Sequence, residues 1–353
     1  MFYEGLSSFQ IDGEEEVNLK GPASKTGNPF YNRAMATNRD ITMCIAAVHF
    51  EEALVRKKNY ELFHHDLPTN SNNHVNNANN NTPHRNIPTY IIFDAMGGSG
   101  VRSLRFLCEL PFLISHCTSH YTPALVTSSG HPVSIQTSSA SEGSTLRTTD
   151  KPAEIVIHYN DISSTAVAGL KHNLMLCLKT GKATLKPCSE AMEKDLREQS
   201  EGKENTIRFN PFFSKDSDIA AGLTFRITSG DLRAYCLNNT FDFIDIDPFG
   251  SPVPFAEHAI CAARKEGIIA VTATDTSSLA GAYPAVCMRR YWSIPTSGYN
   301  KHEMALRILI WRMVLAAASY DIGLFPVFSL SSDHFVRVFL KVKKSVKDAE
   351  AAL

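Results

Sequence analysis

Residues 90–106 read YIIFDAMGGSGVRSLRF, and this stretch decides the fold class because a short apolar run passes through glycines into a helical pattern. Asp94 ends the apolar run, and Gly97, Gly98 and Gly100 occupy the turn that follows. Glycines in such a turn let a ligand approach the backbone closely, but a tight strand-to-helix turn needs them as well. The spacing is not the G-x-G-x-x-G of dinucleotide enzymes, and the P-loop lysine is absent. The stretch predicts a nucleotide-type loop in an α/β protein.

Short β-branched runs alternate with helical patterns along the chain, which is typical of a parallel sheet built from βαβ units. The predicted strands are 89–93, 155–159, 224–227, 241–246 and 268–272. The predicted helices are 101–109, 163–178, 254–264 and 302–319. Near the end, two extended runs at 324–330 and 334–342, joined by a few polar residues, predict an antiparallel hairpin. Five parallel strands and this hairpin make a seven-stranded sheet.

The length of 353 residues fits one large α/β domain with insertions or two modest domains, and we expect one catalytic domain over residues 1–353, interrupted by segments that cannot supply a packed core. We expect insertions at about 64–86, which is rich in Asn, at about 115–150, which is rich in Ser, Thr and Pro, and at about 179–222, which is charged. The net charge of the chain is -1. Any contact with a polyanion must therefore use a local basic patch.

Cysteine spacing and hydropathy exclude several protein classes. The eight cysteines form no CxxC pair, so neither a zinc knuckle nor a disulfide framework is predicted, and free thiols in a reducing compartment fit best. The first residues, MFYEGLSSFQIDGEEE, lack the basic and apolar regions of a signal peptide. No apolar run reaches the roughly 18 residues that a membrane span needs. We expect a soluble intracellular protein with no membrane partner and no metal.

Two further predicted strands end in acidic residues. Asp161 follows the strand that ends in HYN, and Asp231 ends the segment ITSGD. Ligands bind outside the carboxyl ends of the strands in open α/β sheets, where an acid accepts hydrogen bonds from ribose hydroxyls. The alternative role for Asp161 is that of N-cap for the helix predicted at 163–178. Three successive strands end in Gly or Asp at this edge, which favours a ligand site.

Residues 241–260 read FDFIDIDPFGSPVPFAEHAI and carry the chemistry. The buried run delivers Asp245 and Asp247, and Pro248 then breaks the strand so that Phe249 lies in a turn. The lone pair of an exocyclic base amine is delocalised into the ring, so the amine attacks a methyl donor poorly unless it is held in line and polarised. Asp247 has the acceptor for that amine and Phe249 the ring to stack on the base. The alternative is an ordinary strand end followed by a Pro-Gly turn.

Two other motifs carry less specific signals. His302 and Glu303 begin HEMAL, which lacks the second histidine of a zinc helix and predicts the first turn of an amphipathic helix. The run RRYW at 289–292 combines phosphate-binding and base-stacking residue types. Either an RNA contact or an ordinary surface loop accounts for that run.

Several sequence blocks, in order, resemble the tRNA dimethyltransferases that convert guanine 26 to N2,N2-dimethylguanine. The resemblance extends over most of residues 28–342, and its blocks are NPFYNRAMATNRDIT, DAMGGSGVRSLR, ND at 160–161, DIDPFGSP, TATDTSSLAGAYP, HEMALRIL and SDHFVRVF. It implies a class I S-adenosylmethionine-dependent methyltransferase fold, in which a Rossmann-like seven-stranded sheet ends in an antiparallel hairpin. It also implies S-adenosyl-L-methionine as the cofactor, tRNA as the partner, and the nucleus or the mitochondrion as the compartment.

The resemblance also implies roles for individual residues. Asp247 corresponds to the catalytic carboxylate and Phe249 to a base-stacking residue. Arg39 is expected to reach the methionine carboxylate, since guanidinium–carboxylate pairs are strong and geometrically specific, and Leu232 to offer its backbone N–H to the adenine. The full set of expected cofactor-binding residues is Arg39, Asp94, Gly97, Arg102, Asp161, Asp231 and Leu232.

The chain departs from the family in three places. The glycine loop reads MGGSG where serine and alanine are commoner, and residues 31–33 read YNR where relatives have YNP. The sequence ends at Leu353, so we expect the family's C-terminal tRNA-binding domain to be missing and tRNA binding to be weak. Two alternatives stay open at this point: a methyltransferase for another exocyclic amine in RNA or DNA, such as adenine N6, and a non-catalytic RNA-binding relative.

Overall fold

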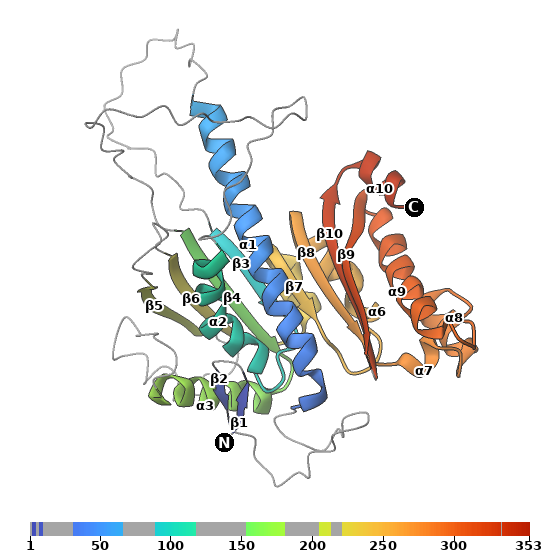
Figure 1. The fold of residues 1–353 in the computed structure, drawn as a ribbon, viewed down its shortest axis with the longest axis horizontal. Helices are drawn as coiled ribbons and strands as arrows, with labels where there is room; N and C mark the ends of the chain where they lie inside the picture. The colour runs from blue at the N-terminus through green and yellow to red at the C-terminus, as the bar shows by residue number, and fades with distance from the viewer. Residues whose placement is uncertain are drawn as a thin grey trace.

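A computed structural model of the chain describes residues 2–4, 7–9, 31–65, 89–117, 153–180, 205–212, 221–332 and 334–353. Its centre is an eight-stranded sheet in the order β5-β6-β4-β3-β7-β8-β10-β9 (Figure 1). The strands of this sheet are β3 (Thr89–Asp94), β4 (Ala153–Asp161), β5 (Asn205–Phe212), β6 (Ala221–Ser229), β7 (Phe241–Ile246), β8 (Ala263–Ala273), β9 (Ile322–Ser332) and β10 (Phe335–Lys344).

Helices cover the sheet on both faces, and a small hairpin of β1 (Phe2–Glu4) and β2 (Ser7–Phe9) packs beside α2 and α3 (Figure 1). A 3-10 turn, η1 (Arg33–Met35), precedes the first helix. The helices are α1 (Ala36–His65), α2 (Val101–Cys117), α3 (Ser164–Thr180), α5 (Leu232–Asn238), α6 (Val253–Ala262), α7 (Thr276–Leu279), α8 (Pro284–Tyr291), α9 (Lys301–Ala318) and α10 (Val346–Ala352).

The predicted parallel sheet is confirmed. Strands β6, β4, β3, β7 and β8 pair in parallel, in the order that their βαβ crossovers produce. Strand β7 has the limits that the sequence predicts, and all six of its residues are buried. A central strand of a parallel sheet is covered on both faces, which explains why it is continuously apolar apart from its aspartates.

Two hydrophobic cores form, one on each face of the sheet. Side chains alternate between the faces along a strand, so Ile92 and Phe243 lie in the core under α1, α2 and α3, while Phe93 and Ile244 lie in the core under α6 and α9. These pairs are also register partners on β3 and β7. The same alternation decides which face each acidic residue at the strand ends occupies.

The predicted terminal hairpin is confirmed as β9 and β10, and β10 pairs antiparallel with β8. One additional strand corrects the expected count of seven: β5 lies in the stretch 179–222 that was expected to be an insertion and pairs antiparallel with β6. Ile207 and Phe209 alternate along β5 and are buried in the core. Two apolar residues at period 2 suffice for an edge strand, although the stretch around them is charged.

Helix and insertion boundaries differ from the predictions in a few places. The helix predicted at 254–264 ends at Ala262, because Ala263 adopts an extended conformation and begins β8. The insertions expected at 64–86 and 115–150 lie almost wholly outside the described residues, since α1 runs to His65 and α2 to Cys117. Among the helices that the structure describes, none has an apolar stretch long enough to cross a bilayer.

Candidate active site at the carboxyl edge of the sheet

From β3 the chain continues to one side of the sheet through β4 and β6, and it then returns to the other side of β3 through β7 and β8. The strand order therefore reverses at β3. Open α/β sheets bind their ligands in the crevice outside the carboxyl ends of the strands at such a switch point. Asp94 ends β3 and Asp247 follows the end of β7, so the fold brings these two residues to that crevice. The fold therefore gathers these two predicted residues at the edge where open α/β sheets bind ligands.

A row of polar side chains crosses four strands on the sheet face that α1 and α2 cover. Asp94 on β3 and Asp245 on β7 are register partners, and Thr272 on β8 and Arg337 on β10 form a second register pair. The side chains of all four are fully buried or nearly so. Buried charges are costly unless they are paired, so these side chains depend on one another for their stability. We call the row, together with the side chains that hydrogen-bond or ion-pair with it, the electrostatic unit.

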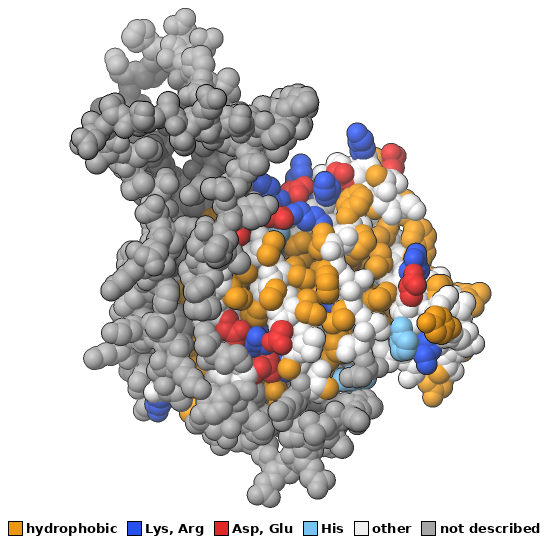
Figure 2. Space-filling view, viewed as in Figure 1, with side chains coloured by type: hydrophobic (Ala, Val, Ile, Leu, Met, Phe, Trp, Pro, Cys, Tyr) orange, Lys and Arg blue, Asp and Glu red, His pale blue; other side chains and the backbone are white. Residues whose placement is uncertain are grey.

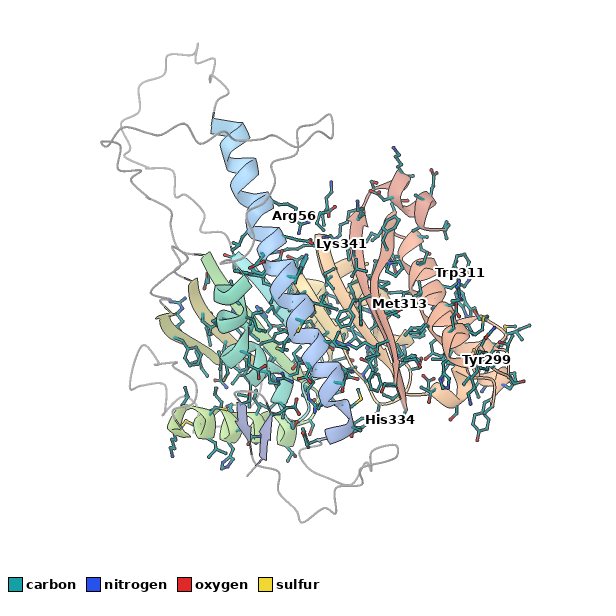
Figure 3. The ribbon with its side chains drawn as sticks, viewed as in Figure 1. Arg56, Tyr299, Trp311, Met313, His334 and Lys341 are labelled. Carbon is teal, nitrogen blue, oxygen red and sulfur yellow. The ribbon has the colours of Figure 1, made fainter. Side chains whose placement is uncertain are left out.

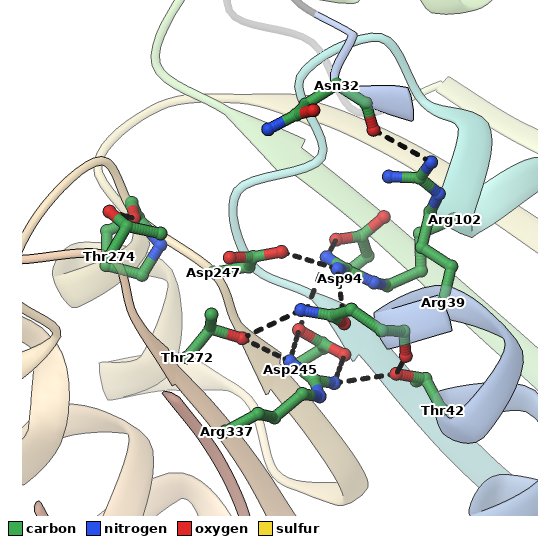
Figure 4. A network of polar contacts seen from close by, with 12 residues as sticks. Asn32, Arg39, Thr42, Asp94, Arg102, Asp245, Asp247, Thr272, Thr274 and Arg337 are labelled. Atoms are coloured by element: carbon green, nitrogen blue, oxygen red, sulfur yellow. Dashed lines mark hydrogen bonds and ion pairs between the residues drawn. The ribbon is translucent and has the colours of Figure 1, made fainter. Parts of the chain in front are cut away.

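Arg102, in the first turns of α2, is the centre of that unit (Figure 4). Its Nη2 donates to Asp247 Oδ2 at 2.5 Å and to Asn38 Oδ1 at 3.3 Å. Its Nη1 lies 3.3 Å from Asp245 Oδ1 and 3.8 Å from Asp94 Oδ1. Burial opposes the charge of the guanidinium, but the three carboxylates outweigh it and raise the pKa of Arg102. One arginine thus holds carboxylates from two strands.

Arg337 completes the unit from the opposite side. Its guanidinium is fully buried and forms a two-point ion pair with Asp245, one contact being 3.3 Å from Nη1 to Oδ1. It also donates to Thr272 Oγ1 at 2.5 Å and to Thr42 Oγ1 on α1 at 2.8 Å (Figure 4). Asp245 is therefore clamped between two arginines and belongs to the framework of the site.

The two outer carboxylates have opposite protonation tendencies. Burial opposes ionisation of Asp247, but the charges of Arg102 and Arg337 and the hydrogen bond from Arg102 lower its pKa. Burial raises the pKa of Asp94 to about 6, against the attraction of Arg102, and Ser103 donates to its Oδ2 at 2.7 Å. Asp94 Oδ1 is buried and has no hydrogen-bond partner within the described ranges. That oxygen is an acceptor for a donor that a ligand supplies.

The turn after β7 is fastened to the end of β8. Gly250 has a φ of 88°, its N–H donates to Thr274 Oγ1 at 2.6 Å, and its carbonyl accepts from Thr274 N–H at 3.0 Å. Only glycine adopts such a φ without strain, which fixes its place in the turn. Phe249, the preceding residue, is 57% exposed. The turn therefore presents an aromatic ring beside the arginine-held Asp247.

Asp161 links the end of β4 to the glycine loop. Its Oδ2 accepts from Gly98 N–H at 2.9 Å and its Oδ1 from Ser163 N–H at 2.8 Å. The alternative role as N-cap of α3 is wrong, because the capping hydroxyl belongs to Ser163, whose Oγ accepts from Ala166 N–H at 3.3 Å. Each carboxylate oxygen of Asp161 retains acceptor capacity toward the crevice.

The glycines of the loop serve packing within the protein. A Cβ on Gly97 would lie 2.0 Å from the ring of Tyr159, and one on Gly100 would lie 2.3 Å from Leu170. Gly100 also has a φ of 75°. Close packing on β4 and α3 therefore explains these two glycines, and the close approach of a ligand is not needed to account for them.

Asp231 and Leu232 begin α5 at the end of β6. Asp231 is the N-cap of this helix: its Oδ1 accepts from Arg233 N–H at 2.9 Å, and its carboxylate pairs with the Arg233 side chain. Hydrogen bonds from Arg233 lower the pKa of Asp231. Leu232 is buried and occupies the first helical position, where a backbone N–H has no acceptor within the helix. The expected contact of that N–H with a ligand stays a prediction.

Arg39 has a partner that the sequence did not suggest. Its Nε and Nη2 donate to the two carboxylate oxygens of Glu4, each at 2.6 Å, and its Nη2 also donates to the carbonyl of Asn32 at 3.1 Å. Both side chains of the Arg39–Glu4 pair are 8% exposed. A ligand carboxylate would have to displace Glu4 to pair with Arg39, so its cofactor contact also stays a prediction.

Several residues of the unit escaped the sequence analysis as site residues, among them Asn38, Thr42, Asp245, Thr272 and Arg337. Asp245 was seen only as part of the buried run. Arg337 interrupts the apolar strand VRVFL, and a charged residue inside a strand that must be buried is the signal that could have revealed it.

Known proteins resemble this chain along most of its length. The family model described as "TRM: N2,N2-dimethylguanosine tRNA methyltransferase" matches residues 7–117 and 130–353. A tRNA (guanine(26)-N(2))-dimethyltransferase of Thermococcus kodakarensis is 45% identical over 129 residues, which is 36% of this chain and 34% of the relative. Its counterpart in Methanococcus maripaludis strain C7 is 26% identical over 98% of this chain and 63% of the relative.

A solved structure shows the same fold. The complex of Trm1 from Pyrococcus horikoshii with S-adenosyl-L-methionine superposes with a TM-score of 0.58 and 24% identity, and the match covers 99% of this chain and 63% of that one. The chain thus has the class I S-adenosylmethionine-dependent methyltransferase fold. Nearly the whole of this chain is matched, but it spans only 63% of the length of the Methanococcus maripaludis relative and of the Pyrococcus horikoshii structure.

Proposed function

Because the chain belongs to the N2,N2-dimethylguanosine tRNA methyltransferase family, we propose that it transfers methyl groups from S-adenosyl-L-methionine to N2 of guanine 26 in tRNA. The observation that carries this proposal is the pairing of Asp247 with Arg102 beside the exposed Phe249. It provides an ionised acceptor and a stacking surface at one point of the crevice. Those are the two groups that a poorly nucleophilic base amine requires.

The residues of the crevice fit the proposed cofactor. Asp161 offers acceptor capacity to ribose hydroxyls, and Asp94 Oδ1, which has no hydrogen-bond partner among the described residues, offers an acceptor to the amino group of the methionine portion. When bound, S-adenosyl-L-methionine supplies a methyl carbon activated by its sulfonium. Arg39 takes the methionine carboxylate in this proposal, provided that Glu4 yields its place.

Asp247 orients and polarises the attacking amine. Its Oδ2 is held by Arg102, so Oδ1 accepts a hydrogen bond from an N–H of the N2 amine, which turns the single lone pair of that nitrogen toward the methyl group. Positive charge develops on N2 as the new N–C bond forms and the C–S bond breaks. The lowered pKa keeps Asp247 ionised, which suits electrostatic stabilisation of that charge. The N2 proton is finally lost to solvent, and S-adenosylhomocysteine leaves.

Phe249 holds the base in the plane that this geometry needs. Its ring is 57% exposed beside Asp247, in a turn fixed by Gly250 and Thr274. A base that has left its stack in the RNA regains stacking energy of roughly 1–3 kcal/mol on such a ring. Phe249 and Asp247 are therefore the proposed catalytic residues.

The test is methyl transfer from labelled S-adenosyl-L-methionine to unmodified tRNA, followed by mass spectrometry of the nucleosides. We expect N2-methylguanosine and N2,N2-dimethylguanosine from tRNA with guanine 26, and neither product when adenine replaces it. Methylated adenosine would instead establish the alternative amine. The absence of any transfer by protein that binds tRNA would establish a non-catalytic relative.

A further inference from the structure

The segment from α7 to the start of α9 is unusual in its charge. Residues 276–302 contain Arg289, Arg290 and Lys301 but no Asp or Glu, in a chain whose acids and bases nearly cancel. Four aromatic residues share the segment: Tyr283, Tyr291, Trp292 and Tyr299. We call this segment the α8 surface. Cations interleaved with aromatic rings are the residue types that bind single-stranded nucleic acid.

Several large apolar side chains of the α8 surface face solvent, although Tyr291 is buried. Tyr283 is 59% exposed, Trp292 62%, Ile294 71% and Tyr299 102%. Figure 3 shows Tyr299 at the outer edge of the molecule, and in Figure 2 the same end carries hydrophobic side chains with a cation and a histidine among them. Large exposed apolar side chains gathered at one end of a molecule are a feature of interaction sites.

The exposed ring of Trp292 is held in place. Trp292 ends α8 in the left-handed conformation, with a φ of 54°. The guanidinium of Arg312 lies over the indole at 4.3 Å from the ring centroid, and Arg312 is itself anchored by donating to the carbonyl of Arg290. A residue in this backbone conformation, stacked on a buried arginine, gives a fixed platform.

The α8 surface is also fastened to the catalytic turn. Asp275 accepts from the buried Tyr291 hydroxyl at 2.5 Å and pairs with Arg290 at 3.0 Å. Its neighbour Thr274 exchanges hydrogen bonds with Gly250 in the turn that carries Phe249. The platform and the base-stacking ring thus belong to one continuous edge of the fold.

We infer that the α8 surface binds the substrate RNA strand next to the target base, which rests on the function proposed above. Trp292 and Tyr299 stack on flanking bases or riboses, and Arg289 and Lys301 contact phosphates. Arg290 is neutralised by Asp275 and acts within the fold. Residues 276–302 contain no acid, which favours a polyanion because cations that no acid of the segment neutralises are available to phosphates.

The test uses the complete native protein and unmodified tRNA, with Tyr299→Ala, Trp292→Ala and Arg289→Ala as separate variants. Tyr299 is fully exposed, so its truncation leaves the fold intact even if loss of Trp292 does not. Filter binding is measured at two salt concentrations and cofactor affinity by calorimetry. Tyr320→Ala and Lys347→Ala are the matched controls, an exposed tyrosine and an exposed lysine beyond the far end of α9.

Each aromatic variant should raise the Kd for tRNA about tenfold, and Arg289→Ala should reduce the slope of log affinity against log salt by about 1. Cofactor affinity and both controls should match the wild type. Wild-type tRNA affinity in all three variants would overturn the inference, as would a change of oligomeric state on light scattering without a change in RNA binding. Because these readouts are binding constants, they stay distinct from methylation: failure of methyl transfer by the wild type overturns the proposed function alone.

Discussion

The crevice has two halves that hold their carboxylates by different means. At β3 and β7, Asp94 and Asp245 are buried, Asp247 is mostly buried, and all three are held by arginine side chains. At β4 and β6, Asp161 and Asp231 are partly exposed and accept hydrogen bonds from backbone N–H groups. Side-chain ion pairs fix the charge and direction of a catalytic group, whereas backbone donors fix a position while leaving acceptor capacity for a ligand.

The difference between the halves predicts different losses. A buried ion pair that loses one partner leaves an uncompensated charge in the protein interior. A partly exposed carboxylate that is removed leaves N–H groups that water reaches. Disruption of the arginine-held half should therefore cost stability and catalysis, while disruption of the backbone-held half should cost ligand affinity.

The largest stability effect is expected at Arg337. Replacement of Arg337 by Met leaves Asp245 buried with only the shared Arg102, and we expect a loss of about 3–5 kcal/mol in the free energy of unfolding. Urea denaturation measures it. The double variant Arg337→Met/Asp245→Asn removes both charges and should recover much of the loss. If the double variant is no more stable than the single one, the pair is not the electrostatic unit described.

A smaller effect, with a defined pH dependence, is expected at Asp94. Its folded pKa of about 6 lies above the ordinary value of 3.8, so its contribution to stability is complete below the ordinary pKa and is lost as the pH rises through 6. Asp94→Asn removes that titration. The free energy of unfolding of the Asp94→Asn variant, relative to that of the wild type, should therefore increase between pH 4 and pH 7 by on the order of 2 kcal/mol. Denaturation curves at both pH values check the sign, and a constant difference would contradict it.

The backbone-held half is tested at Asp161. Asp161→Ala should raise the Kd for S-adenosyl-L-methionine roughly tenfold, because hydrogen bonds to a charged acceptor contribute about 1.5 kcal/mol or more. The melting temperature should change little, since Ser163 supplies the cap of α3. Calorimetry and thermal melts of one preparation measure both. Asp231→Ala is the comparison: it loses a helix cap, so it should lower stability by about 1 kcal/mol.

Sequence patterns predicted the parallel strands and the terminal hairpin because those elements depend on local periodicity. The limits of β7 were correct, for example, since a buried run ends where Pro248 follows. Asp247 and Phe249 were found through the same local pattern. The edge strand β5 was missed because only two apolar residues mark it within a charged stretch.

The electrostatic unit itself depends on contacts between distant parts of the chain. Arg337 donates to Thr42, 295 residues away, and to Thr272 across a strand pair. The apolar run VRVFL marks Arg337 as a charge in a buried strand, but only the packing of α1 over the sheet shows which side chains it pairs with. Glu4 likewise meets Arg39 through the folding of the N-terminal hairpin onto α1. No periodicity predicts either pairing.

The central claim is that Asp247, held ionised by Arg102, acts in the transition state of methyl transfer. The most direct measurement is the single-turnover rate of Asp247→Asn with saturating labelled S-adenosyl-L-methionine and unmodified tRNA. The variant keeps the size of the side chain but removes its charge. We therefore expect the rate to fall by about 10²-fold or more, with cofactor affinity within a few-fold of wild type. A variant that transfers methyl groups at the wild-type rate would contradict the assignment of Asp247 as the catalytic carboxylate.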